Sequence, residues 1–183
     1  MINLLLFWFI LVGEIMLGFA LLLSYFSPSR RIWPPPGKKT WQFYYIWVLT
    51  YSSLIGLIIL GFIDWNSFIL DLLVLRLIGG IIFAVGIFIL IWGMRTLSLH
   101  LSHGLKGELI TNGPYKFSRN PQYIGINLAF LGYIFITNSF LSLITGVFSI
   151  FLFFLTPFVE EPWLKEVLGS KYEEYCKKVR RFF

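Results

Sequence analysis

Five long apolar runs, separated by short polar stretches, make up most of the chain. They cover Leu4 to Tyr25, Tyr44 to Ile63, Leu72 to Leu97, Gln122 to Thr137 and Leu141 to Phe158. A helix needs roughly 17 to 25 mainly apolar residues to cross a bilayer, so each run predicts a transmembrane helix. Only Asn138 and Ser139 separate the last two runs, which predicts an antiparallel helix hairpin.

The composition supports a membrane protein. Hydrophobic residues make up 57% of the chain and charged residues 13%, and the mean hydropathy is +0.78. Charged residues make up about 25% of soluble proteins. The fold class expected is therefore all-α, a polytopic membrane protein of about five transmembrane helices, with residues 1–183 forming a single membrane domain. The first run has no basic segment before it and no small-residue cleavage site, which favours a retained helix over a signal peptide.

The positive charges predict the orientation. In a five-span arrangement every Lys and Arg except Arg76 falls on one side of the membrane. Positive residues in short loops stay in the cytoplasm. The N-terminus is therefore expected outside, and the C-terminus and active site on the cytoplasmic side. The net charge of +6 on that side suits the anionic inner leaflet and does not require a nucleic acid partner.

Two polar blocks flank the last hairpin, and they hold the candidate functional side chains. The first covers residues 113–123 and the second residues 160–164. Because the hairpin returns the chain to the same side, the two blocks are expected to meet at one membrane edge. Together they offer carboxylates, an amide, phenols and a guanidinium, which could hold a zwitterionic small molecule. The residues concerned are Tyr115, Arg119, Asn120, Tyr123, Glu160 and Glu161.

Some of these residues also have simpler interpretations. Asn120 and Pro121 form an ordinary helix start, with Asn as the N-cap. Pro162 is expected to begin an amphipathic tail helix that Glu160 and Glu161 would stabilise through its dipole, and Gly169 is expected to separate it from a second amphipathic tail helix on the cytoplasmic side. The segment 30–39, with three consecutive prolines, is either a lid over a site or an interfacial anchor with Trp33 and Trp41 at headgroup depth.

Other residues carry weaker signals. Glu14, inside the first run, is either functional or a buried acid bonded to a neighbouring helix. His100 and His103 stand three apart, but without a third ligand nearby they are a weak zinc signal, and no metal is predicted. A few glycines in the third run are expected to allow close helix contact, namely Gly79, Gly80 and Gly86.

From Leu109 to its end the chain resembles the superfamily of isoprenylcysteine carboxyl methyltransferases and phospholipid methyltransferases. Members carry Gly-x-Tyr-x-x-x-Arg-His-Pro-x-Tyr-x-Gly before a helix hairpin, and the residues in register are Gly113, Tyr115, Arg119, Pro121, Tyr123 and Gly125. After the hairpin they carry Glu-Glu-x-x-Leu, Gly-x-x-Tyr-x-x-Tyr and a basic tail. The residues in register are Glu160, Glu161, Leu164, Gly169, Tyr172, Tyr175, Arg180 and Arg181.

The resemblance implies a methyltransferase that uses S-adenosylmethionine and an amphiphilic acceptor from the bilayer, either an isoprenylcysteine carboxylate or a lipid-like molecule. It divides the domain into a three-helix part, 1–97, and a cofactor-binding part, 98–183. Membrane lipids are the expected partners. The implied catalytic residues are Arg119, Arg180 and Arg181, the last two for an anionic group of the acceptor. The implied cofactor-binding residues are Gly113, Tyr115, Asn120, Pro121, Tyr123, Glu160 and Glu161.

One departure from the superfamily pattern affects the chemistry. Many members have His where this chain has Asn120, so a role that needs a titrating imidazole is not available at this position. Two other functions remain open from the sequence. One is an NADPH-dependent enzyme similar to sterol reductases, and the other is a non-catalytic protein that binds lipids or acts as a scaffold.

Overall fold

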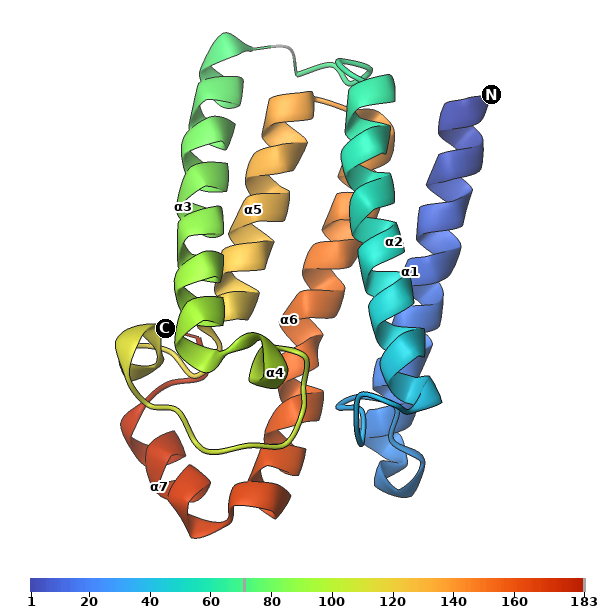
Figure 1. The fold of residues 1–183 in the computed structure, drawn as a ribbon. Coiled ribbons are helices and arrows are strands. Elements are labelled where there is room, and N and C mark those ends of the chain that lie inside the picture. Colours follow the sequence, from blue (N-terminus) through green and yellow to red (C-terminus); the bar gives the residue numbers. More distant parts are fainter. Residues whose placement is uncertain (71, 183) are drawn as a thin grey trace.

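The structure, a computed structural model, describes residues 1–70 and 72–182, and every regular element in these ranges is a helix. Five long helices form a bundle (Figure 1). They are α1 (Ile2–Phe26), α2 (Trp41–Ile63), α3 (Leu73–Leu97), α5 (Pro121–Thr137) and α6 (Phe140–Leu168). The shorter elements are η1 (Pro28–Arg30), α4 (Leu99–Ser102), η2 (Gly113–Lys116) and α7 (Ser170–Lys178).

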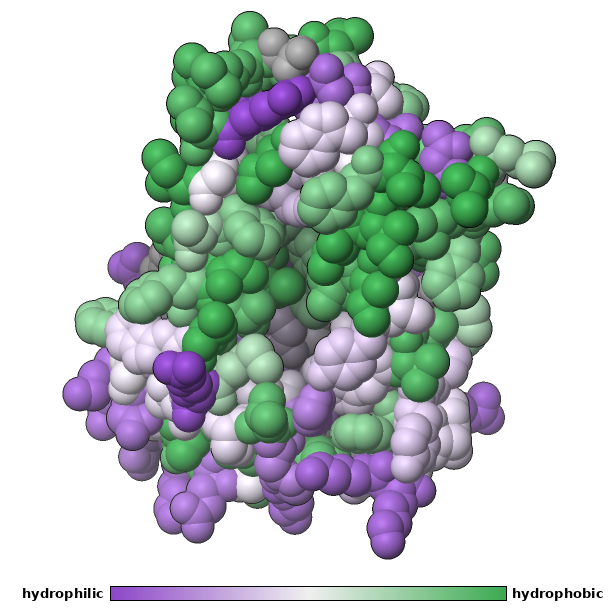
Figure 2. Space-filling model, turned by 45° about the horizontal axis from the view of Figure 1, so that its top comes forward, coloured by the Kyte–Doolittle hydropathy of each residue, from purple (hydrophilic) through white to green (hydrophobic). Residues whose placement is uncertain are grey.

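The five helices fall on the five apolar runs, which confirms the all-α prediction. Four of them, α1, α2, α3 and α6, are long and apolar enough to cross a membrane. Helix α5 has 17 residues, at the lower end of the roughly 17 to 25 that a crossing requires. Large apolar side chains cover much of the bundle's outer surface (Figure 2). Such a surface suits lipid, and the helices fit a multi-pass membrane protein.

The charged segments gather at one end of the bundle, called here the polar end. The segments 27–40, 98–120 and 169–182 all lie there, opposite the N-terminus (Figure 1). Hydrophilic side chains accordingly collect along this end of the space-filling view (Figure 2). The shared side of the positive residues is thus confirmed. Its assignment to the cytoplasm stays a prediction.

Helices α3 and α5 pack closely because glycines face each other between them. A Cβ added at Gly86 would lie 2.5 Å from the backbone N of Ala129, and one at Gly125 would lie 2.5 Å from that of Leu90. Gly79 faces α5 in the same way, at Phe135. The prediction of close contact was wrong for Gly80, because a Cβ there meets nothing within 4 Å.

The hairpin between α5 and α6 is confirmed. Asn138 takes a left-handed conformation with φ of 46° and donates its side-chain amide to Asn66 Oδ1 at 2.6 Å. Ser139 caps α6 by accepting the backbone N–H of Ser142, and its hydroxyl donates to Asp64 at 2.7 Å. The two-residue turn is therefore tied to the end of α2.

The prediction of a separate tail helix beginning at Pro162 was wrong. Helix α6 continues through both Pro157 and Pro162 and ends at Leu168, where Gly169 follows with φ of 60°. An internal proline costs a helix one hydrogen bond, but tertiary contacts can outweigh this loss. The ion pairs of Glu161 supply such contacts within the same turn. Glu160 and Glu161 consequently lie inside a helix and do not cap one.

Candidate functional site

The two polar blocks meet at the polar end of the bundle, as predicted. Tyr123, in the first turn of α5, donates its hydroxyl to Glu160 of α6 at 2.6 Å. The two residues stand 37 positions apart, and the antiparallel hairpin brings their helix ends together. A carboxylate and a phenol thus share one strong hydrogen bond at the edge of the bundle.

Glu161 joins three separate parts of the polar end. Its carboxylate accepts bonds from the amide of Asn120 at 3.1 Å and from the guanidinium of Arg119 at 3.2 Å. Arg181 adds two more, at 2.8 and 3.0 Å, and its guanidinium lies 4.1 Å from the centre of the Phe158 ring. The hydrogen bond to Glu161 raises the pKa of Arg181. This buried carboxylate therefore fastens the C-terminal segment to the start of α5.

Asn120 occupies the N-cap position of α5, but its side chain makes no capping bond. Instead the side-chain amide donates to Glu161 and, at 3.1 Å, to the carbonyl oxygen of Arg181. The expected helix start, with Asn120 as the N-cap residue and Pro121 as the first helical residue, is therefore confirmed, but the Asn120 side chain bonds to the charged carboxylate of Glu161 and not to the helix. Asn120 acts here as a donor, a role that does not need a titrating ring.

A cavity of about 90 Å³ lies at the polar end, below the start of α5. Several predicted site residues line it, namely Tyr115, Arg119, Asn120, Tyr123 and Glu160. The loop after α4 covers it with Leu105, and the end of α6 adds Trp163 and Leu164. This polar-end cavity thus combines a polar edge with apolar and aromatic walls.

The other predicted site residues lie outside this lining. Gly113 begins η2 with φ of 55° and packs against the side chain of Thr96. Pro121 is the buried first residue of α5. Arg180 exposes its side chain, and its carbonyl accepts the backbone N–H of Arg119 at 3.0 Å. The role of Arg180 and Arg181 toward an acceptor anion stays a prediction. The guanidinium of Arg181 already has Glu161 as its partner.

Gln122 is a lining residue that the sequence analysis missed. Its amide donates to the hydroxyls of Ser102 and Tyr115, both at 2.9 Å. It occupies a variable position of the first motif, so its type gave no signal. Trp163 and Leu164 lie in the segment that was expected to form a separate tail helix, so their place in the cavity lining was not predicted.

Buried phenols surround the lower part of the polar-end cavity. Burial raises the pKa of Tyr175 to about 12, and it also raises the pKa of Tyr115 and of Tyr172. Tyr175 donates its hydroxyl to the backbone carbonyl of Tyr115 at 2.6 Å, which ties α7 to η2. These phenols stay protonated at neutral pH, so they offer hydrogen bonds and ring surface without charge.

A larger cavity of about 280 Å³ lies inside the bundle and is bounded by α1, α2, α3, α5 and α6. Its walls are mostly apolar, with the carboxyl group of Glu14 among them. Glu14 accepts a hydrogen bond from Ser149, which agrees with the buried-acid interpretation. The two cavities adjoin each other, because both are lined by Ser102, Gln122 and Tyr123. These residues, named here the neck, lie between a cavity with a polar edge and a mostly apolar one.

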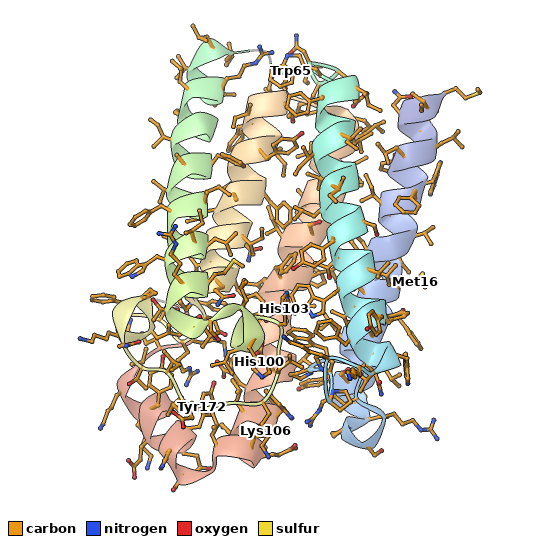
Figure 3. The ribbon with its side chains drawn as sticks, viewed as in Figure 1. Met16, Trp65, His100, His103, Lys106 and Tyr172 are labelled. Atoms are coloured by element: carbon orange, nitrogen blue, oxygen red, sulfur yellow. The ribbon has the colours of Figure 1, made fainter. Side chains whose placement is uncertain are left out.

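The proline-rich segment and the two histidines lie near the larger cavity. Trp33 is buried in the protein, with 4% of its surface exposed, so its ring does not face lipid headgroups, whereas Trp41 is 62% exposed. The depth of these residues in a membrane stays a prediction. His100 and His103 lie in and just after α4, below the end of α3 and beside the lower half of α6 (Figure 3). Among the described residues no group of three or more His, Cys, Asp or Glu side chains could hold a metal ion.

Comparison with known proteins points to one family. A family model described as phospholipid methyltransferase matches residues 74–171. Phosphatidylethanolamine N-methyltransferase B of Dictyostelium discoideum is 27% identical over 103 residues. This alignment covers 52% of the chain and 52% of the relative, so the chain spans about half the length of the curated protein that it matches. No solved structure matches the chain.

Proposed function

The chain belongs to the phospholipid methyltransferase family, and from this membership we propose that it is a membrane methyltransferase that uses S-adenosylmethionine to methylate a phospholipid-like acceptor. The observation that carries the proposal is the meeting of two unlike cavities at the neck. A cofactor with a polar amino acid and ribose suits the polar-end cavity. An acceptor with acyl chains suits the apolar cavity within the bundle.

The residues of the polar-end cavity fit this cofactor. Glu160 offers a carboxylate to the ribose hydroxyls or to the ammonium group, and Tyr123 holds that carboxylate in place. The Nε of Arg119 is buried without a hydrogen-bond partner, so it remains a donor for the cofactor carboxylate. Trp163 and Leu164 offer apolar surface to the adenine. We assign Glu161, with Arg181, the role of holding the start of α5 in position.

The size of the polar-end cavity requires a movement on binding. Its volume of about 90 Å³ is well below the roughly 300 to 1,000 Å³ typical of small-molecule pockets. The segment 103–112 contributes Leu105, Gly107 and Ile110 to its lining and contains no helix. We expect this loop to move outward when the cofactor enters and to cover it afterwards, as lids do in many enzymes.

Bound S-adenosylmethionine would supply an electrophilic methyl group on a sulfonium, and transfer needs the acceptor aligned with it. The contribution of the protein is therefore mainly positioning, with Tyr123 and Gln122 at the point where cofactor and acceptor approach each other. The similar Dictyostelium protein is named for methylation of phosphatidylethanolamine. On that basis we propose a phospholipid amine as the acceptor, with the reaction on the cytoplasmic side.

The test is calorimetric titration of the detergent-solubilised chain with S-adenosylhomocysteine, followed by incubation with methyl-labelled cofactor and total membrane lipids. Wild type should bind, and the label should appear in a lipid amine. Tyr123→Phe, which releases Glu160 from its partner, should weaken binding about three- to tenfold. Tyr44→Phe removes the same hydroxyl from an exposed position and should change nothing. A wild type that neither binds the nucleoside nor labels any lipid would refute the proposal.

A further inference from the structure

Four rings form one wall of the larger cavity, named here the aromatic wall. They are Trp33, Trp47, Tyr51 and His103, and all four line the cavity. Trp47 is at their centre, with ring centroids 5.9 Å from Trp33, 5.3 Å from Tyr51 and 4.4 Å from His103. Because the rings come from the proline-rich segment, from α2 and from the residue after α4, the wall exists only in the folded chain.

Hydrogen bonds and close packing hold the rings of the wall in place. Trp47 donates its indole N–H to the carbonyl of His103 at 3.3 Å, and the hydroxyl of Tyr51 lies 3.0 Å from Nε2 of His103. The backbone N–H of Trp33 donates to Ser24 at 2.9 Å. Gly104, with φ of 73°, brings the loop so close that an added Cβ would lie 2.6 Å from the Trp33 ring. The wall is therefore preorganised.

The lining of the larger cavity suits a cation better than an anion. Among the described residues that line it, Glu14 carries the one carboxyl group and none is Lys or Arg. Burial first, and then the nearby Lys38 and His100, lower the pKa of His103, so its ring is neutral at neutral pH. The Lys38 side chain is itself exposed. An anionic carboxylate in this cavity would have no partner, which is costly, whereas aromatic faces attract a cation.

The aromatic wall also lies beside the neck. His103 directly follows Ser102, which accepts the side-chain amide of Gln122 at 2.9 Å. Figure 3 shows His103 at α4, below the end of α3 and beside α6. A group held against the wall is therefore next to the point where the two cavities meet. The wall is thus placed to hold the reacting end of an acceptor, while the rest of the cavity takes its apolar part.

We propose that the aromatic wall is the binding subsite for the amine headgroup of the acceptor, and that it selects amine lipids over lipids with an acidic headgroup. This inference rests on the proposed function. In the transfer a neutral amine nitrogen forms the new N–C bond as the S–C bond breaks, and the nitrogen gains the positive charge that the sulfur loses. Ring faces stabilise that developing charge without needing an N–H donor.

The experiment compares two lipids of the same shape on the full chain saturated with S-adenosylhomocysteine. One is a short-chain phosphatidylcholine, and the other is its neutral isostere with a 3,3-dimethylbutyl headgroup. Calorimetry should show that wild type binds the cationic lipid about tenfold more tightly. Trp47→Leu should reduce this preference to about twofold or less. Trp47→Phe should retain most of it, because it keeps an aromatic face.

Trp41→Leu serves as the matched control, since Trp41 begins the same helix but is exposed. It should leave the preference unchanged, and all three variants should bind S-adenosylhomocysteine as wild type does. Equal affinity of wild type for the two lipids, or no binding of either, would overturn the subsite while the cofactor site stands. Loss of nucleoside binding by wild type would instead overturn the proposed function. The wild-type lipid comparison remains decisive even where a variant fails to fold.

Discussion

The two cavities draw on different parts of the chain. The polar-end cavity is built from residues between Leu97 and Tyr175, nearly all within the segment 74–171 that matches the family. The larger cavity takes much of its wall, from Glu14 to Leu54, from helices that precede this segment. The two cavities are therefore formed largely by two different parts of the chain. The family-matched part carries the features proposed for the cofactor, and the first two helices carry those proposed for the acceptor.

The largest expected effect comes from Glu161, which joins the C-terminal segment to the start of α5 beside the polar-end cavity. Glu161→Ala leaves Arg119 without its ion-pair partner in a site where the Arg119 side chain is only 12% exposed. Breaking a buried pair by removing one partner costs about 3 to 5 kcal/mol. We expect a marked drop in the apparent melting temperature in detergent, and release of the C-terminal segment that a protease-protection assay would detect.

Glu173→Ala is the control for this change, since it removes the same charge from an exposed position on α7. It should leave both measurements close to wild type. If Glu161→Ala melts like the control, then Glu161 does not fasten the C-terminal segment, and the proposed separation of its role from that of Glu160 fails.

A change at the neighbouring residue, Glu160, should weaken cofactor binding without lowering the stability of the fold. Glu160→Gln keeps the shape of the side chain and an acceptor for Tyr123 but removes the charge. A hydrogen bond to a charged group contributes about 1.5 to 3 kcal/mol, so S-adenosylhomocysteine should bind at least tenfold more weakly in a calorimetric titration. The melting temperature without ligand should change little. An unchanged affinity would remove Glu160 from the cofactor site.

The contact between α3 and α5 supports both cavities, because α5 carries Gln122 and Tyr123. Gly125→Ala would place a Cβ 2.5 Å from the backbone N of Leu90, and overpacking of this kind costs about 1 to 3 kcal/mol. Gly80→Ala puts the same methyl group into open space on α3 and should be neutral or slightly stabilising. Melting of both variants in detergent tests this contrast. A stable Gly125→Ala protein would show that the helices can separate without cost.

The helices and the meeting of the two polar blocks were predictable, and the course of the chain between Phe158 and Gly169 was not. Apolar runs of membrane length directly indicate spanning helices, and the two residues between the last two runs permit only a hairpin. Pro162 behind two glutamates is a common helix start, so it suggested a new helix. The continuation of α6 depends on Arg119 and Arg181, which are distant in sequence and whose partners no local pattern reveals.

The larger cavity was the least predictable part of the site. Its rings are spread over residues 33, 47, 51 and 103, and each alone has an ordinary explanation as a membrane-interface or packing residue. Glu14 was noticed because a carboxyl group inside an apolar run is costly. Which cavity it lines follows only from the packing of α1 against α2 and α6, which the apolar pattern leaves open.

Glu14 offers the smallest and most specific test of the division between the two cavities. Glu14→Gln keeps an acceptor for Ser149 but removes the one carboxyl group among the described residues of the larger cavity. Along α2, Trp47 is six residues, about 9 Å, from Ser53, which faces Gly13, the residue before Glu14. We therefore expect the preference for the cationic lipid to fall by about twofold or less, much less than for Trp47→Leu. Ser149→Ala, which keeps the carboxyl group, should leave the preference unchanged. Affinity for S-adenosylhomocysteine should be unaffected in both variants, and a parallel loss of nucleoside binding in Glu14→Gln would mean that the two cavities act as a single site.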